Sequence, residues 1–315
     1  MARNASRVSK HDSAGCIRIP IKEHLCIVNR IRQNSMKTKR LTTGADDIKE
    51  AGGIIRDGGL VAFPTETVYG LGANALDALA VRSVYAAKGR PSDNPMIVHI
   101  AMAEELEPLV LNGRESISLD ALKLIGNLWP GPLTMVFPKS AIVPDTVTGG
   151  LDTVAIRMPS NETARALILA ANRPIAAPSA NLSGKPSPTT ADDVLEDMDG
   201  RIDAVIMGEQ CDVGIESTVV DMTGEVPVIL RPGIITKEWM EAILGKEVRY
   251  HQSLLERPET ELDPEEIIGN EDATRNAAGE DATRNAAGEN TADAAGNSGS
   301  SEADTAGNSG SSAAD

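Results

Sequence analysis

The stretch DDIKEAGGIIRDGGLVAFP, residues 46–64, contains the two kinds of secondary structure from which the fold is built. Apolar residues recur at helical spacing from Asp46 to Asp57, and the pair Gly58-Gly59 is a helix stop signal. The apolar run Leu60–Phe63 is typical of a short buried strand, which Pro64 ends. A helix followed directly by a buried strand is typical of an α/β fold.

The same alternation continues to about residue 245. We predict further helices at residues 77–87, 103–111, 116–127, 161–171, 190–197 and 236–244. We predict further strands at residues 96–100, 133–137, 153–158, 175–178, 203–206, 217–221 and 226–230. Strands interleaved with helices predict a single α/β domain with a mostly buried sheet.

Charge divides the chain into three parts. Residues 1–40 carry ten Lys/Arg and two Asp/Glu, and residues 251–315 carry three and fifteen. The remaining 17 basic and 29 acidic residues lie between 41 and 250, so the three net charges are +8, −12 and −12, which sum to −16. We therefore predict a basic N-terminal extension at 1–40, a folded domain at 41–250 and an acidic tail at 251–315.

Both ends of the chain lack the pattern of a packed core. EDATRNAAG at 271–279 recurs at 280–288, and AGNSGSS at 295–301 recurs at 306–312. Such repeats bury too little apolar surface to offset the entropy of ordering, so we predict a disordered tail. For residues 1–40, three interpretations remain open: a disordered extension, translation that starts at Met36, or a transit peptide.

Composition excludes several classes of function. An acidic domain argues against broad non-specific binding of nucleic acid, and seven aromatic residues are too few for stacking on single-stranded bases. Cys16, Cys26 and Cys211 are scattered and odd in number, which favours a reducing cytosol over a disulfide framework or a zinc site. No run reaches the roughly 18 apolar residues of a membrane span, so we expect no contact with membranes.

Five polar segments rich in Gly or Pro lie where α/β domains form sites. In the first, residues 63–72, Thr65, Glu66 and Thr67 supply hydroxyl and carboxylate groups. A capped turn between a strand and a helix explains these residues equally well. In the second, Lys88-Gly89-Arg90 forms a compact anion site, or else a helix end whose cations suit the helix dipole.

The same second segment continues to Asn94 and His99, and His99 is either a site residue or a satisfied core histidine. In the third segment, residues 153–159, Thr153 and Arg157 share one face of a strand because strand side chains alternate. A buried Arg157 requires an anion beside it.

The fourth segment, residues 176–188, offers many hydroxyl and amide donors for a phosphate, or forms a plain solvated turn. Its Gly184-Lys185 is followed by Pro186, so it is not a P-loop. The fifth segment, residues 214–233, places Ser217 at the start of a strand and Arg231 at the end of the next.

If these segments converge, their ligand is a polyanion, because their cations stand out against an acidic domain. These cations are Lys88, Arg90, Arg157, Lys185 and Arg231. Zinc-like spacing and a G-x-S-x-G elbow are both missing from the sequence, so nucleophilic hydrolysis is poorly supported. The residues by themselves predict binding of a nucleotide polyphosphate and a small polar co-substrate.

Seven stretches in this order resemble the threonylcarbamoyl-AMP synthase family of YrdC-like enzymes. They are PTETVYGLG (64–72), K-x-R (88–90) with NPMIVHI (94–100), WPGPLT (129–134), TVAIRMP (153–159), APSANLSGKPSPT (177–189), ESTVVD (216–221) and RPG (231–233). The resemblance implies a twisted, mostly parallel or mixed open sheet with flanking helices around a concave basic cavity.

The resemblance also implies a nucleotidyltransferase reaction in the cytoplasm. L-threonine, bicarbonate or CO2 and ATP would give threonylcarbamoyl-AMP and pyrophosphate, with Mg²⁺ as cofactor. Partner transferase proteins would then pass the threonylcarbamoyl group to the tRNA adenosine next to the anticodon, and tRNA itself is a further candidate partner.

By the same resemblance, the candidate residues divide into two sets, with no resident metal site. The residues expected to hold threonine are Thr67, His99, Arg157, Ala177 and Ser217. The residues expected around ATP are Lys88, Arg90, Asn94, Thr153, Ser179, Asn181, Ser187 and Arg231, of which Lys88 and Arg90 are the expected catalytic cations.

The chain departs from longer family members, which continue through a linker into a second globular domain. Acidic repeats follow Tyr250 here, so we expect that domain to be absent. Two alternatives remain: an RNA-binding module that uses the same concave surface, and the carbamoyl-transfer domain of a hydrogenase-maturation protein.

Overall fold

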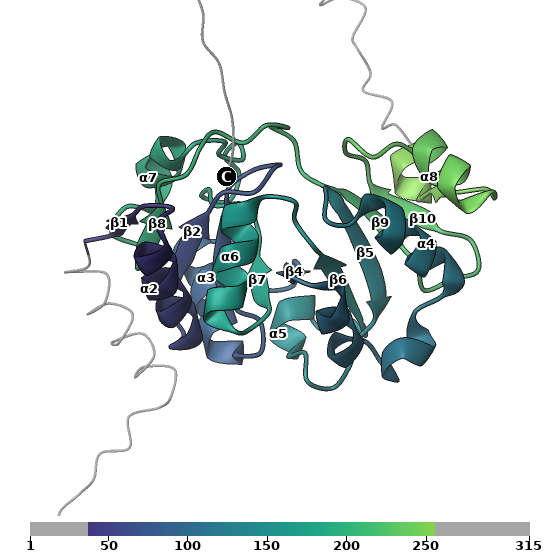
Figure 1. Ribbon diagram of the computed structural model, residues 1–315, viewed down its shortest axis with the longest axis horizontal. Helices are drawn as coiled ribbons and strands as arrows, with labels where there is room; N and C mark the ends of the chain where they lie inside the picture. Colours follow the sequence, from purple (N-terminus) through teal and green to yellow (C-terminus); the bar gives the residue numbers. More distant parts are fainter. Residues whose placement is uncertain (1–36, 256–315) are drawn as a thin grey trace, which may run out of the picture. The chain divides into compact units, whose positions relative to one another are not determined.

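The computed structural model describes residues 37–255, which all lie in one compact unit (Figure 1). Eleven strands within these residues form one sheet in the spatial order β1-β8-β2-β3-β7-β4-β6-β5-β9-β10-β11. The strands are β1 (Lys39–Leu41), β2 (Val61–Phe63), β3 (Gly70–Asn74), β4 (Ile97–His99), β5 (Leu133–Pro138), β6 (Thr153–Arg157), β7 (Ile175–Ala177), β8 (Ala204–Ile206), β9 (Thr218–Asp221), β10 (Val228–Arg231) and β11 (Arg249–Tyr250).

The helices connect these strands. They are α2 (Ala45–Arg56), α3 (Ala78–Lys88), α4 (Leu119–Leu128), α5 (Asp145–Thr148), α6 (Glu162–Ala171), α7 (Ala191–Met198), α8 (Lys237–Leu244) and α9 (Gln252–Leu255), with the 3-10 helices η1 (Ala103–Leu109) and η2 (Gly113–Ser116). Side-chain caps begin several of them: Asp77, Ser118 and Asn161 accept backbone N–H bonds at the starts of α3, α4 and α6.

The sheet buries residues on both faces. In β2, Val61 and Phe63 join a core that α2 and α6 cover, whereas Ala62 joins a second core on the other face. Helices α3, α4, α7 and α8 contribute to that second core. Helices α2 and α6 pack against each other, as Figure 1 shows. Alternation of side chains along each strand therefore produces a layered α/β domain.

The face that α2 and α6 cover is hollow farther along the sheet. In the middle of the sheet, Ile97 of β4 pairs with Ala155 of β6, and Ala155 pairs with Val136 of β5. All three residues line a cavity, whereas their neighbours Val98, Ile156 and Met135 lie in the second core. Strands β4, β6 and β5 thus form the floor of a cavity on one face and bury the other.

The predicted fold class, an α/β domain with an open sheet and flanking helices, is confirmed, and of the two alternatives, mostly parallel or mixed, the sheet is mixed. Five strand pairings are parallel and five are antiparallel. Strand β3 lies between β2 and β7 and runs antiparallel to both, so it accounts for two of the antiparallel pairings.

Strand β3 was predicted to be part of a loop, because its glycines hide the pattern of a strand. A Cβ at Gly72 would lie 2.8 Å from Ile175 Cγ2 and 2.9 Å from Phe63 Cε1. Glycine is therefore required there by the close approach of Phe63 and Ile175, and it leaves no side chain to reveal the period of a strand.

Element boundaries differ from the prediction at several places. The expected helix at 103–111 is the 3-10 helix η1, which contains Pro108, and the expected helix at 116–127 starts at Leu119 after the cap Ser118. The expected domain boundaries at 40/41 and 250/251 fall inside β1 and just before α9. The disorder predicted for the two ends concerns mainly residues 1–36 and 256–315, which lie outside the described residues. None of the helices described in 37–255 is long and apolar enough to cross a membrane.

Candidate functional site

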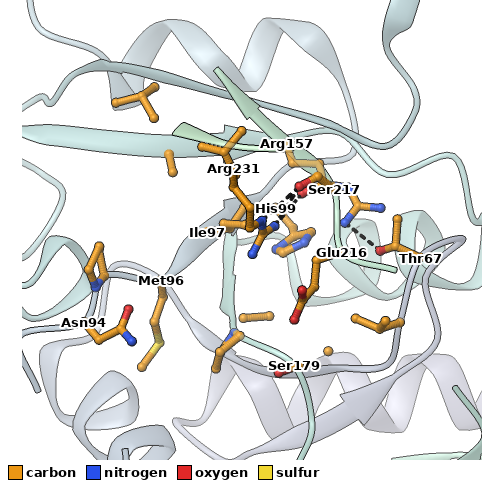
Figure 2. Close-up of a pocket in the computed structure, with 18 of the residues that line it drawn as sticks. Thr67, Asn94, Met96, Ile97, His99, Arg157, Ser179, Glu216, Ser217 and Arg231 are labelled. Atoms are coloured by element: carbon orange, nitrogen blue, oxygen red, sulfur yellow. Dashed lines mark hydrogen bonds between the residues drawn. The ribbon is translucent and has the colours of Figure 1, made fainter. Parts of the chain in front are cut away.

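A cavity of about 290 Å³ opens over the central strands (Figure 2). Ten of the thirteen predicted site residues line it: Thr67, Arg90, Asn94, His99, Thr153, Arg157, Ala177, Ser179, Ser217 and Arg231. The other three, Lys88, Asn181 and Ser187, are not among its lining residues.

The turn between β2 and β3 is organised by the Thr65 hydroxyl. Thr65 Oγ1 donates to the Val68 carbonyl at 2.6 Å and accepts from the backbone N–H groups of Thr67 and Val68. It also lies 2.9 Å from Thr67 Oγ1. The turn is therefore held by its own side chain, and it places the Thr67 hydroxyl in the cavity wall.

Arg157 lies in the floor next to His99 because the two residues pair in register on the parallel strands β6 and β4. Arg157 Nη1 donates to Thr67 Oγ1 at 2.9 Å, and Figure 2 draws this bond. Arg157 Nη2 lies 2.8 Å from Glu66 Oε1, in an ion pair between two buried side chains. A buried Arg157 was predicted to need an anion beside it, and Glu66 is that anion within the protein.

The charge states at this end follow from burial and from this ion pair. Burial by itself would raise the pKa of the Glu66 carboxyl, but the neighbouring Arg157 outweighs burial and holds it below its ordinary value. Burial, reinforced by the charge of Arg157, lowers the pKa of His99 to about 3. The His99 ring is therefore neutral at neutral pH, and its Nδ1 has no hydrogen-bond partner among residues 37–255.

A second polar cluster forms where β9 and β10 meet the cavity. Ser217 Oγ lies 2.7 Å from the buried Thr134 Oγ1 and accepts from Arg231 Nη2 at 3.1 Å. Arg231 also donates from Nε and Nη2 to the Ser217 carbonyl. The close approach that this cluster needs is possible because Gly233 has no Cβ, which would lie 2.5 Å from the Thr218 nitrogen.

Arg90 and Asn94 form another wall of the cavity. Arg90 Nη2 donates to Asn94 Oδ1 at 2.5 Å and to the Pro95 carbonyl at 3.1 Å. Figure 2 shows Asn94 and Met96 across the cavity from Thr67 and Arg157. The cavity therefore has two ends, one built around Arg157 and one around Arg90.

Lys88 lies behind the cavity wall, where sequence reasoning had expected a catalytic phosphate contact. Its Nζ donates to the carbonyls of Ser179 and Asn181 at 2.5 Å each and to Asn181 Oδ1 at 3.1 Å. Burial and the nearby Arg90 lower the pKa of Lys88 to about 8. Its three protons are already engaged, so Lys88 holds the loop that presents Ser179.

Two acidic residues were not assigned to the site from the sequence. Glu216 lines the cavity and accepts from Ser187 Oγ at 2.9 Å, so Ser187 acts through Glu216. Glu66 had been noted only as a polar residue of its segment. The need for an anion beside a buried Arg157 was the signal that could have identified it.

The lining combines three arginines, Arg90, Arg157 and Arg231, with one carboxylate, Glu216. This excess of positive charge occurs in a chain whose net charge is −16. In the described residues, no group of three or more His, Cys, Asp or Glu side chains is arranged to hold a metal ion. The cavity is thus suited to an anionic ligand.

Comparison with known proteins gives a consistent family assignment. A family model for Sua5/YciO/YrdC proteins, described as "Telomere recombination", matches residues 53–233. Over 207 residues the chain is 56% identical to threonylcarbamoyl-AMP synthase of Pyrococcus abyssi, covering 66% of this chain and 59% of the relative. It is 48% identical over 238 residues to threonylcarbamoyl-AMP synthase of Bacillus subtilis, covering 73% and 67%.

Solved structures agree with this result. The crystal structure of P. abyssi Sua5 complexed with L-threonine matches with a TM-score of 0.65 and 52% identity, over 71% of this chain and 64% of that chain. Escherichia coli YciO has a TM-score of 0.55 at 23% identity, over 64% and 97%, which is a likeness of fold. The chain spans about 59% of the length of the P. abyssi relative. These matches confirm the resemblance seen in the sequence, and the chain belongs to the Sua5/YciO/YrdC family.

Proposed function

We propose that this protein is an L-threonylcarbamoyladenylate synthase, which makes threonylcarbamoyl-AMP and pyrophosphate from L-threonine, bicarbonate or CO2 and ATP. The observation that carries this proposal is the convergence of Arg90, Arg157 and Arg231 on one cavity of an acidic protein. The relatives named threonylcarbamoyl-AMP synthase and the threonine complex of P. abyssi Sua5 support the choice of substrates.

The end around Arg157 is the proposed site for threonine. The guanidinium of Arg157 suits the carboxylate, because an arginine fork matches two carboxylate oxygens. The Thr67 hydroxyl, the neutral His99 ring and the Ser217 hydroxyl are available for the amine and hydroxyl groups, and the Ala177 carbonyl is a further acceptor. A neutral His99 offers one N–H and one lone pair, so it can bind either group without adding charge.

The end around Arg90 is the proposed site for ATP, which enters with Mg²⁺. Arg90 and Arg231 suit the phosphates, and Asn94, Thr153 and Ser179 provide polar groups around them. Mg²⁺ in nucleotide sites typically keeps several waters and takes one or two carboxylates, which fits the single lining carboxylate Glu216. Lys88 and Asn181 contribute by holding the loop of Ser179.

The proposed reaction is positional. The threonine amine adds to CO2 and forms a carbamate, with loss of a proton to solvent. A carbamate oxygen then attacks the α-phosphorus of ATP, and the bond from that phosphorus to the bridging oxygen breaks to release pyrophosphate. Arg90 and Arg231 stabilise the negative charge that grows on the phosphoryl groups, and the bound orientation supplies much of the rate.

We further propose that the product serves tRNA modification. Partner transferase proteins would move the threonylcarbamoyl group to the adenosine beside the anticodon, with the protein acting in the cytoplasm and with tRNA as a further candidate partner.

The direct test is release of pyrophosphate by purified protein. With Mg-ATP and bicarbonate present, release is expected to depend on added L-threonine, and threonylcarbamoyl-AMP should be detected by mass spectrometry. Folded protein that releases no pyrophosphate under these conditions contradicts the proposal.

A further inference from the structure

Several buried polar atoms at the Arg157 end of the cavity lack a hydrogen bond to any of the residues that the structure describes. They are both carboxylate oxygens of Glu66, Nη2 of Arg157 and Nδ1 of His99, of which Glu66 Oε1 and Arg157 Nη2 form an ion pair with each other. The three residues are only 7%, 3% and 4% exposed, respectively. Buried polar groups without partners are rare in folded proteins, and several at one place indicate a ligand.

We propose that Glu66 is a positioning residue that also determines specificity for the charge of the ligand. It fixes the guanidinium of Arg157 and balances its charge, so that this end accepts a net-neutral, zwitterionic amino acid in preference to a carboxylate without an amine. The inference rests on the proposed function and deepens it, because it explains how the site recognises an amino acid as such.

The geometry of the ion pair supports this role. Glu66 Oε1 lies 2.8 Å from Arg157 Nη2, yet neither atom has the alignment of a hydrogen bond. The other two guanidinium nitrogens donate to Thr67 Oγ1 at 2.9 Å and to the Gly131 carbonyl at 3.4 Å. Glu66 is therefore one of three groups that fix the orientation of the guanidinium.

Charge balance decides which ligands fit. The charged side chains at this end are Arg157, Glu66 and Arg231, whose Nη2 donates to Ser217 Oγ at 3.1 Å. His99 is neutral, and burial raises the pKa of the neighbouring Cys211 thiol to about 11. A simple carboxylate at Arg157 would be repelled by the Glu66 carboxylate that shares this arginine. A zwitterion brings an ammonium group that Glu66 attracts, and such interactions are strong away from bulk water.

The test measures binding by isothermal titration calorimetry without ATP. The two ligands are L-threonine and β-hydroxybutyrate, which is threonine without its amino group. The proteins are wild type, Glu66→Gln, Glu66→Asp and the control Glu50→Gln. Glu50 forms an exposed ion pair with Lys39 at 2.5 Å, and neither residue lines the cavity.

We expect wild type and Glu50→Gln to prefer threonine, and Glu66→Gln to reduce that preference about tenfold or more. Glu66→Asp keeps the charge, so it should keep the preference for threonine while weakening the binding of both ligands. This variant tests the proposal if Glu66→Gln does not fold. An unchanged preference in Glu66→Gln, or a lost preference in folded Glu66→Asp, overturns the inference. A wild type that binds neither ligand contradicts the proposed function itself.

Discussion

Arg157 and His99 obtain their chemistry from residues that are distant in the sequence. Arg157 is held by Thr67, which lies 90 positions earlier, and its charge is balanced by Glu66. His99 is neutral because it is buried beside Arg157. Arg157 and His99 could be identified from the sequence as candidate site residues. Their charge states could not, because these depend on neighbouring residues in the folded protein.

Arg90 offers the clearest test of a single residue, because its side chain bonds only to its own loop at Asn94 and Pro95. Arg90→Ala should therefore remain folded and lower kcat/KM for pyrophosphate release about a hundredfold or more, as loss of one transition-state donor does. The control Arg82→Ala removes an exposed cation of α3 that lies outside the cavity. Wild-type kinetics in Arg90→Ala would refute its placement at the phosphates.

Individual elements differ in how well the sequence predicted them. Helices α2, α3, α6 and α8 were expected close to their observed bounds, because their apolar spacing and their start or stop signals agree. Strand β3 was not expected, because Gly70 and Gly72 carry no side chains and are selected by the packing of Phe63. A propensity pattern cannot reveal a residue whose selection depends on another strand.

The contact between α2 and α6 can be tested with adjacent glycines of α2. A Cβ at Gly52 would lie 2.6 Å from the Ala170 carbonyl carbon, whereas a Cβ at Gly53 would meet nothing within 4 Å. Gly52→Ala should destabilise the protein by about 1–3 kcal/mol through overpacking. Gly53→Ala should stabilise it by about 0.5–1 kcal/mol, since alanine favours a helix interior.

Urea unfolding of both variants measures these changes in the free energy of unfolding. Because the substitution and the helix are the same, the difference isolates the contact with α6. Equal effects at the two positions would contradict the close packing described for these helices.

For the whole molecule, the buried His99 makes stability depend on pH. Its pKa is about 3 in the folded protein and 6.5 in the unfolded chain, so between these values the unfolded chain binds a proton that the folded protein does not. Stability contributed by neutral His99 is therefore present above pH 6.5 and is lost as the pH falls, by about 2 kcal/mol between pH 6.5 and 5.

The measurement is urea unfolding at several pH values for wild type and His99→Gln. Between pH 6.5 and 5, the free energy of unfolding should fall less steeply for the variant than for wild type. The Glu66 carboxyl, whose pKa is lowered, does not yet titrate in this range. If the free energy of unfolding of the variant falls as steeply as that of wild type, His99 is not the source of the pH dependence.

The sequence by itself determined the α/β class and most of the elements, because apolar period is readable along the chain. It identified ten of the residues that line the cavity through the resemblance of its motifs to those of a known family. Only the tertiary structure decided the order and direction of the strands, the place of β3 and the partners of the buried charges. It moved Lys88 from the expected phosphate contact to a support of the Ser179 loop, and it paired Arg157 with Glu66. The physical reason is that burial and ion pairing depend on contacts between segments far apart in the chain, which local sequence does not specify.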